Sequence, residues 1–266
     1  MKRYFIRVLS HGFLCIFIFL MLLPVYLAFV AASNDGNTMM QSHIPLVPGS
    51  LLFKNLKAVL SDHLLITGGE PITSMLLNSF FMALAIALGK IIFALGSAFA
   101  LVYFDFPFKK LCFALIFMTM MLPIEVRIVP TFQVVASFGL LNSFTGLTLP
   151  LFVSATGTFL FRQFFKTIPA ELVDAAKLDG AGAIRFFFDM VLPLSKTQIA
   201  SLFVILFVYG WNQYLWPLVI TTETKMATIV MGIRYLAGVA DQVPQWHYIM
   251  AIALVALIPP CLVVML

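Results

Sequence analysis

Long apolar stretches alternate with short polar segments along almost the whole chain. Six stretches are long enough to cross a membrane, since about 20 helical residues at 1.5 Å each span a hydrocarbon core of roughly 30 Å. The predicted spans cover residues 12–32, 73–102, 111–129, 148–165, 199–220 and 247–266. This pattern predicts an all-α fold, a polytopic membrane protein with six transmembrane helices.

The composition excludes an ordinary soluble domain. Hydrophobic residues make up 62% of the chain and charged residues only 10%, against about 25% charged residues in a typical soluble protein. The net charge of +5 could suggest a nucleic-acid partner. The basic residues form no continuous stripe, however, and lie between the apolar stretches, where they set membrane topology instead.

The basic residues are distributed unequally between the two sides of the predicted membrane. One side carries Lys2, Arg3, Arg7, Lys109, Lys110, Arg162, Lys166, Lys177, Arg185 and Lys196, and the other carries Lys54, Lys57, Lys225 and Arg234. Because loops rich in Lys and Arg stay in the cytoplasm, both termini are predicted to be cytoplasmic. A basic start before an apolar stretch also occurs in secretory signals, but no clear small-residue cleavage site follows, so we expect the first span to be retained.

A polar segment, residues 171–194, separates the fourth and fifth spans on the predicted cytoplasmic side. Pro169 suits the first turn of a helix, and the dipole of that helix favours the carboxylates of Glu171 and Asp174. Asp179-Gly180 is expected to end it, because glycine adopts the left-handed conformation at low cost.

A second short helix is predicted over residues 182–191, and Pro193 marks the approach to the fifth span. Small residues lie where the two helices meet, namely Ala175, Ala176, Gly180 and Ala181. Two short helices with such an elbow would let another protein approach closely, although a helix resting on lipid headgroups has the same pattern.

Two pieces of the external loops are expected to be ordered. The segment VPGSLLFKNLKAVL predicts a turn at Pro48-Gly49 and an amphipathic helix after it, and SFGLLNSFTGL predicts a re-entrant or interfacial connector. Each could cap the ends of the spans or receive an external partner.

The chain carries no recognisable catalytic or cofactor motif. A phosphate-binding loop needs GxxxxGK[ST], but Gly89-Lys90 is followed by Ile91 and residue 84 is leucine. Cys15, Cys112 and Cys261 lack metal-site spacing, and the four histidines form no constellation. We therefore expect no enzymatic activity, no metal and no cofactor, so that any energy for active transport must come from a partner.

Charged and amide side chains inside spans are candidates for a solute path. Glu125 and Arg127 lie near the outer end of the third span, where Arg127 could reach the interface or attract an anion such as phosphate. Lys90 lies in the middle of the second span and is expected not to face lipid.

The fifth span carries the amides of Asn212 and Gln213, followed by Tyr214. These three residues are also assigned to the candidate path, although bonding between helices is the commoner use of amides in membranes.

The segment DAAKLDGAGAIRFFFDMVLPLS resembles the EAA loop of ABC-importer permeases. MLPIEVRIVP, SATGTFLFRQFF and YGWNQYLWPL are similar to the sugar-importer branch of that family, and within it to permeases for sn-glycerol 3-phosphate. Asp174 replaces the leading glutamate of the motif, and the family pattern adds a short basic tail beyond Leu266.

The resemblance implies that Glu171, Asp174, Ala175, Ala176, Asp179, Gly180 and Ala181 couple the chain to an ATPase. It implies a second homologous permease, two ATP-binding cassette ATPase subunits and an external solute-binding protein as partners, in the inner membrane. Residues 1–72 would form the first span and an external loop, and residues 73–266 a five-helix permease core with the coupling loop at 166–198.

Two other functions remain compatible with the sequence. A permease for a neutral sugar or oligosaccharide shares most of these motifs. An ion-driven secondary carrier would need an inverted repeat and acidic residues near the bilayer midplane, a role for which only Glu125 is a candidate.

Overall fold

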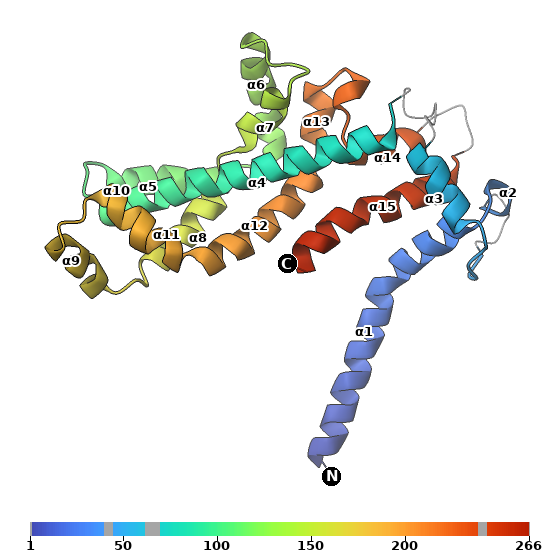
Figure 1. Cartoon of the computed structure of the whole chain (residues 1–266), viewed down its shortest axis with the longest axis horizontal. Coiled ribbons are helices and arrows are strands. Elements are labelled where there is room, and N and C mark those ends of the chain that lie inside the picture. Colours follow the sequence, from blue (N-terminus) through green and yellow to red (C-terminus); the bar gives the residue numbers. More distant parts are fainter. Residues whose placement is uncertain (1, 40–44, 62–69, 239–243, 266) are drawn as a thin grey trace. The chain divides into compact units, whose positions relative to one another are not determined.

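The computed structural model describes residues 2–39, 45–61, 70–238 and 244–265, and throughout these ranges the regular secondary structure is helical (Figure 1). The helices are α1 (Lys2–Ser33), α2 (Gly36–Met39), α3 (Leu52–Ser61), α4 (Ile72–Tyr103), α5 (Lys109–Thr119), α6 (Ile124–Ser137), α7 (Phe144–Thr148), η2 (Leu149–Leu151), α8 (Ala155–Phe165), α9 (Ala170–Leu178), α10 (Ala183–Phe186), the π-helix η3 (Phe187–Val191), α11 (Leu192–Leu194), α12 (Lys196–Trp211), α13 (Leu215–Ile220), η4 (Thr224–Met226), α14 (Ile229–Ala237) and α15 (Trp246–Met265). Helices satisfy all their backbone polar groups internally, which the bilayer requires. The all-α prediction is confirmed.

Three helices within the described ranges are long and apolar enough to cross a membrane alone, over Leu9–Ser33, Ile72–Tyr103 and Trp246–Met265. Two bent pairs qualify as further spans, Phe144–Leu151 with Ala155–Phe165 at 45° and Ala183–Leu194 with Lys196–Trp211 at 72°. The structure thus gives up to five spans by length and composition, and the predicted count of six stays a prediction.

The third, fourth and fifth predicted spans are not continuous helices, and the break in the fourth lies between η2 and α8. Between α5 and α6 the chain breaks at residues 120–123, where Pro123 has an extended ψ of 145° and precedes α6. The residue before a proline is kept out of the helical region, so a helix tends to end there. The fifth predicted span breaks at residues 212–214, between α12 and α13.

The chain forms two compact units, residues 1–76 with 229–261 and residues 77–228 with 262–266. The boundary predicted at residue 72 separates the first span and its external loop from the permease core, whereas the two units are defined by their internal contacts. The predicted boundary therefore stays a prediction.

In the first unit, α3 packs against the end of α1. The amide of Asn55 donates to the carbonyls of Ala32 at 2.8 Å and Asn34 at 2.9 Å, and so satisfies one orphan carbonyl of the last turn and one just beyond the helix. The amphipathic helix predicted here is confirmed, and it caps α1.

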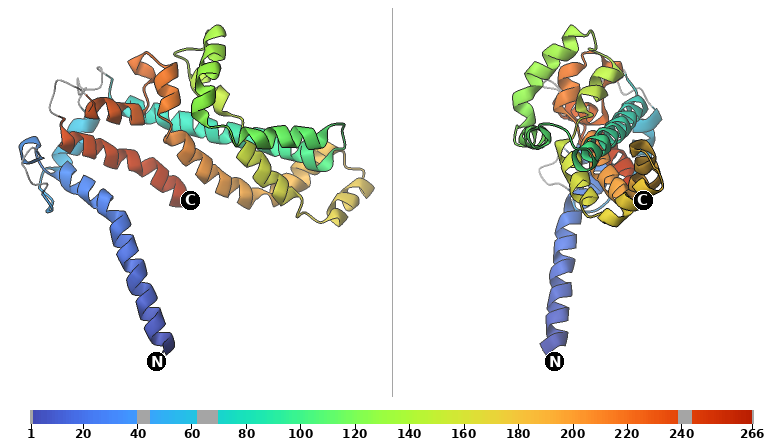
Figure 2. Two further views of the ribbon diagram at one scale, coloured as in Figure 1. Left: turned by 180° about the vertical axis from the view of Figure 1, so that it is seen from behind. Right: turned by 90° about the vertical axis from the view of Figure 1, so that its left-hand side faces the viewer.

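In the second unit, α4 comes close to α8 where Ala94 meets Gly157 and to α12 where Ala83 meets Gly210. A hydrophobic cluster joins α4 to α6, α7 and α13 and is built from Met82, Ile86, Val135, Leu147, Trp216 and Ile220. The indole N–H of Trp216 donates to the carbonyls of Gly146 and Leu147, both at 3.2 Å. These contacts hold the helices around the candidate path together. In Figures 1 and 2, α9 and α10 lie at the end of this unit where α4 ends, away from α6, α7 and α13.

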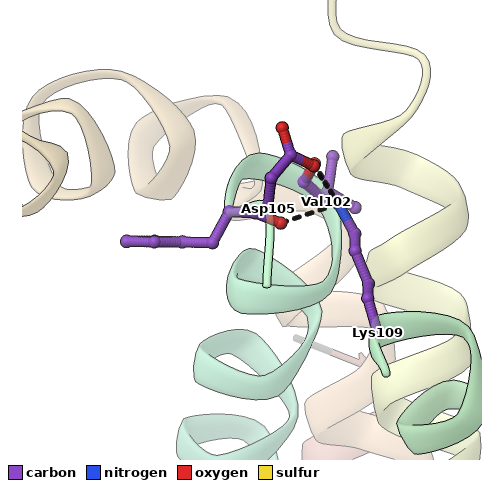
Figure 3. A network of polar contacts seen from close by, with 4 residues as sticks. Val102, Asp105 and Lys109 are labelled. Atoms are coloured by element: carbon purple, nitrogen blue, oxygen red, sulfur yellow. Dashed lines mark hydrogen bonds and ion pairs between the residues drawn. The ribbon is translucent and has the colours of Figure 1, made fainter. Parts of the chain in front are cut away.

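The end of α4 is closed by a lysine from the next helix (Figure 3). The ammonium of Lys109 donates to the carbonyls of Phe104 at 2.7 Å and Val102 at 3.4 Å, and lies 3.4 Å from the carboxylate of Asp105. A cation at the negative end of a helix dipole is favourable. The same lysine, counted above among the basic residues of the predicted cytoplasmic side, therefore also caps the end of α4.

Gly210 lets α12 approach α4 closely. A Cβ at this position would lie 2.8 Å from the Cα of Ala83, closer than real Cβ contacts allow. We expect Gly210→Ala to push the helices apart and to lower stability by about 1–3 kcal/mol. Gly96→Ala, in α4, is the matched control, because its Cβ would meet nothing within 4 Å. Thermal unfolding of the purified complex should show a lower midpoint for Gly210→Ala only. Equal midpoints for the two variants would contradict the close packing.

Candidate functional site

A cavity of about 470 Å³ lies within the second unit, between α4, α6, α8 and α12. Its lining residues are Lys90, Thr119, Met120, Leu122, Arg127, Ile128, Thr131, Pro150, Leu151, Val153, Ser154, Ala155, Thr156, Ile205, Leu206, Tyr209, Gln213, Leu215 and Trp216. The breaks between α5 and α6, between η2 and α8 and between α12 and α13 all contribute to the wall. Irregular backbone at membrane depth is tolerated where it lines a cavity, so this space is the candidate solute path.

Lys90 is the most deeply buried cation of the cavity. Its side chain comes from the middle of α4 and is 7% exposed, so the prediction that it does not face lipid is confirmed. The ammonium donates to the carbonyl of Val153 at 3.2 Å and lies 4.7 Å from the centre of the Tyr209 ring. A neutral carbonyl and an aromatic face stabilise this charge without cancelling it.

The predicted path residues do not all meet in this cavity. Arg127 and Gln213 line it, whereas Asn212 and Tyr214 are not among its lining residues. The side chain of Glu125 lies outside the described part of the chain. The amide of Gln213 donates to the carbonyl of Tyr209 at 3.2 Å, which is a bond within one helix end.

Five polar lining residues escaped the sequence reasoning, namely Thr119, Thr131, Ser154, Thr156 and Tyr209. Helical spacing could have found two of them. Thr131 follows Arg127 by four residues and its hydroxyl donates to the carbonyl of Arg127 at 2.7 Å, while Tyr209 precedes Gln213 by four. Ser154 gives no such signal, because its position depends on the break before α8.

The second candidate region, here called the elbow, consists of α9, residues 179–182, α10 and η3. The helix α9 begins directly after Pro169 and ends at Leu178, and Gly180 has a left-handed φ of 70°. The predicted helix, its end and the second helix are confirmed as local structure. The second helix differs in form, because it changes from α to π at Phe187.

The elbow has an outer and an inner side. Glu171, Asp174, Ala175, Asp179 and Gly180 are exposed, whereas Ala176 is buried and Ala181 is partly buried. Ala176 and Ala181 line a small space of about 160 Å³ together with residues of α4. The small residues therefore do not form one docking surface, since some of them face the chain's own helix.

The outer side carries large apolar residues that the sequence reasoning did not single out. Leu178 is 89% exposed and Ile184 is 77% exposed. The carboxylate of Asp174 pairs with Lys177 at 3.5 Å and that of Asp189 with Arg185 at 3.2 Å, in both cases on the surface. Exposed apolar side chains among charged residues are typical of a protein contact.

The inner side joins the elbow to the ends of α4 and α8 through rings, here called the aromatic joint. Its members are Phe99, Tyr103, Phe165, Phe186 and Phe187. The centroids of Tyr103 and Phe186 lie 5.1 Å apart and those of Phe99 and Phe187 4.9 Å apart. The hydroxyl of Tyr103 also donates to the carbonyl of Phe165 at 3.3 Å. Such close ring packing can carry a displacement of the elbow into two membrane helices.

A family model described as the binding-protein-dependent transport system inner membrane component matches residues 91–266. The chain belongs to this family. The match contains the elbow and the residues given above as lining the cavity except Lys90, which directly precedes the matched segment.

Relatives that share one name align along nearly the whole chain. The sn-glycerol-3-phosphate transport system permease protein UgpE of Yersinia pestis is 52% identical over 263 residues, which cover 97% of this chain and 92% of that protein. UgpE of Rhizobium meliloti is 48% identical over 265 residues, which cover 100% of this chain and 94% of that protein.

A solved structure shares the fold. A chain of a bacterial ABC transporter involved in the import of the acidic polysaccharide alginate superposes with a TM-score of 0.85 over 99% of this chain and 95% of that chain. The sequence identity is 20%, so this likeness concerns the fold alone. The predicted resemblance to ABC-importer permeases is confirmed.

Proposed function

We propose that this chain is a permease subunit of an ABC importer and forms part of the translocation path for sn-glycerol 3-phosphate. The observation that carries the proposal is the identity of about half the residues, over almost the full length, with proteins named for that transport. Diesters of glycerol phosphate are a second substrate class. The cavity supports an anionic solute, because it is lined by Lys90 and Arg127 and no acidic residue is among its described lining.

The elbow supports the view that the energy arrives from outside the chain. The sequence carries no phosphate-binding loop for ATP, and the exposed apolar side chains of Leu178 and Ile184 suit a cleft in another protein. In this proposal two ATPase subunits grip the elbow of this chain and that of a second, homologous permease. ATP hydrolysis in those subunits moves the elbows, and the spans alternate between inward-open and outward-open arrangements. The chain itself is then not an enzyme.

The coupling residues are proposed to act in two ways. Glu171, Asp174, Ala175, Asp179 and Gly180 belong to the outer side that contacts the ATPase. Ala176 and Ala181 act from the inner side, because their small side chains let the elbow sit on α4.

The proposed orientation places the elbow and both termini in the cytoplasm and the complex in the inner membrane. It rests on the unequal distribution of Lys and Arg between the two sides. An external solute-binding protein then delivers the solute from the opposite face.

The test is uptake by the complete complex in proteoliposomes that contain ATP. This chain is reconstituted with a second permease, an ATPase and a solute-binding protein of such an importer from the same organism. We expect uptake of radiolabelled sn-glycerol 3-phosphate that requires ATP and is competed by the unlabelled compound. ATP-driven uptake of a neutral sugar, with none of glycerol phosphate, would overturn the substrate assignment and favour the sugar branch.

A further inference from the structure

Gly89 and Lys90 both contact the non-helical segment that precedes α8 and hold it in place. A Cβ at Gly89 would clash with the ring of Phe152, so this ring rests directly on the backbone of α4. The next residue along α4, Lys90, donates to the carbonyl of Val153 at 3.2 Å. The pair thus fixes the chain segment that forms one wall of the cavity.

The buried charge of Lys90 has a free-energy cost that indicates a function. A buried cation in an apolar helix is expensive, and such residues in membrane proteins are usually functional. An ammonium has three N–H donors, and the carbonyl of Val153 takes one of them. The face of the Tyr209 ring also contacts the ammonium, and the remaining donor capacity can serve a ligand in the cavity that Lys90 lines.

Other positive groups line the same cavity. Arg127, from α6, lines the same cavity as Lys90. Two like charges that share a cavity repel each other, which favours an anion between them. The first residues of the 11-residue helix α8, Ala155 and Thr156, also line the wall. Backbone N–H groups at a helix start have no acceptor within the helix and add partial positive charge.

Neutral polar groups complete the lining. The hydroxyl residues Thr119, Thr131 and Tyr209 and the amide of Gln213 belong to the wall, and no described lining residue is acidic. Hydroxyls and amides can bond the alcohol groups of a polyol, while the cations take its anionic end.

We propose that Lys90 and Arg127 bind the phosphate of the solute in this cavity, and that Lys90 makes the site prefer a phosphate monoester over a diester. This inference rests on the proposed function and deepens it. A monoester carries close to two negative charges at pH 7, because its second pKa is about 6, whereas a diester phosphate carries one. A site with two cations gains more from the doubly charged group.

The first test compares monoester and diester uptake by the reconstituted complex. For Lys90→Gln we expect the KM for sn-glycerol 3-phosphate to rise about tenfold or more and the KM for glycerophosphocholine to rise at most about threefold, since a bond to a charged group is lost. Arg127→Gln is a second variant for the case that Lys90→Gln assembles poorly, because it changes an exposed residue of α6. It should also raise the KM for sn-glycerol 3-phosphate more than the KM for glycerophosphocholine. Lys225→Gln removes an exposed lysine elsewhere and should change neither KM. Equal changes for the two substrates, or none, would overturn the assignment.

The second test measures binding without transport, and so separates this inference from the proposed function. A single cysteine at Thr131, in a complex whose native cysteines are replaced, is alkylated with a neutral maleimide. Inorganic phosphate should slow the alkylation when Lys90 is present and not in Lys90→Gln. Failure of phosphate to protect the wild-type cavity overturns the site even if uptake succeeds, whereas protection without uptake upholds the site and contradicts the proposed substrate transport.

The same assay distinguishes soluble phosphate from lipid. The alkylation is repeated in nanodiscs of phosphatidylcholine with and without phosphatidylglycerol. Protection by soluble phosphate in both lipids supports a solute site. Protection that needs phosphatidylglycerol and ignores soluble phosphate would assign the cavity to a lipid headgroup instead and overturn the proposal.

Discussion

Replacing Leu178 with aspartate is expected to abolish ATP-driven uptake while leaving the permease itself folded. Leu178 is the last residue of α9 and is 89% exposed, so the change removes almost no contact within the chain. If an ATPase cleft buries this side chain, the variant places an unpaired carboxylate in that contact. Loss of a central anchor commonly costs about 2 kcal/mol or more, equivalent to a loss of more than tenfold in affinity. The measurement is the amount of ATPase that copurifies with the permeases, together with uptake.

Leu178→Met is the matched control, because it keeps an apolar side chain of similar size at the same place. It should retain both the ATPase and uptake. If Leu178→Asp also copurifies with its full share of ATPase and transports at the normal rate, Leu178 is not part of the contact.

Substitutions at some residues of the elbow can test docking of the ATPase, whereas substitutions at other residues would also disturb the chain itself. Bulk at Ala176 would meet the chain's own α4, because this side chain is buried beside a small internal space. At Gly180 a Cβ would meet nothing within 4 Å, but the φ of 70° strains any other residue. Loss of uptake in variants at these two positions would therefore mix internal packing or backbone strain with docking.

The second large effect is expected at the aromatic joint. Phe186 is 7% exposed, and its ring lies 5.1 Å from that of Tyr103 and 6.3 Å from that of Phe99. Phe186→Ala should remove the packing that links the elbow to α4, at a cost of about 3–5 kcal/mol for a fully buried ring. We expect the ATPase to remain bound and to hydrolyse ATP, while uptake falls to a small fraction. The measurement is the ratio of solute taken up to ATP hydrolysed in proteoliposomes.

Phe188→Ala provides the control within the same run of three phenylalanines. Phe188 is 58% exposed, and its ring contacts that of Phe187 at 5.1 Å. This variant should keep a normal ratio of uptake to hydrolysis. If both variants lower the ratio equally, the aromatic joint does not transmit the motion of the elbow.

The local features of the elbow were accessible from the sequence because they depend on neighbours along the chain. Pro169, Asp179 and Gly180 define the first helix through backbone preferences that no distant contact needs to supply. The inner and outer sides of the elbow were not accessible. Ala175 and Ala176 are adjacent and chemically identical, and only the contact with α4 makes one of them exposed and the other buried.

In the candidate solute path, too, some features were accessible from the sequence and others depend on tertiary contacts. Lys90 and Arg127 are conspicuous in the sequence because charges are rare in apolar segments. Their presence in one cavity with Tyr209 depends on the breaks that divide the third, fourth and fifth predicted spans, and an apolar stretch looks the same whether it forms one helix or two. Hydrophobicity averaged over a window reports burial in lipid and not the direction of the backbone.

The sequence by itself determined the helical membrane class, the local shape of the elbow and the likeness to importer permeases. The first two follow from hydrophobic length and from turn chemistry, which act between residues close together in the chain, and the likeness follows from the resemblance of the motifs. The tertiary structure decided which small residues face α4, which rings form the aromatic joint and which polar side chains share the cavity. Those choices depend on contacts between segments that can be more than a hundred residues apart along the chain, such as Lys90 and Tyr209, and no local preference can specify them.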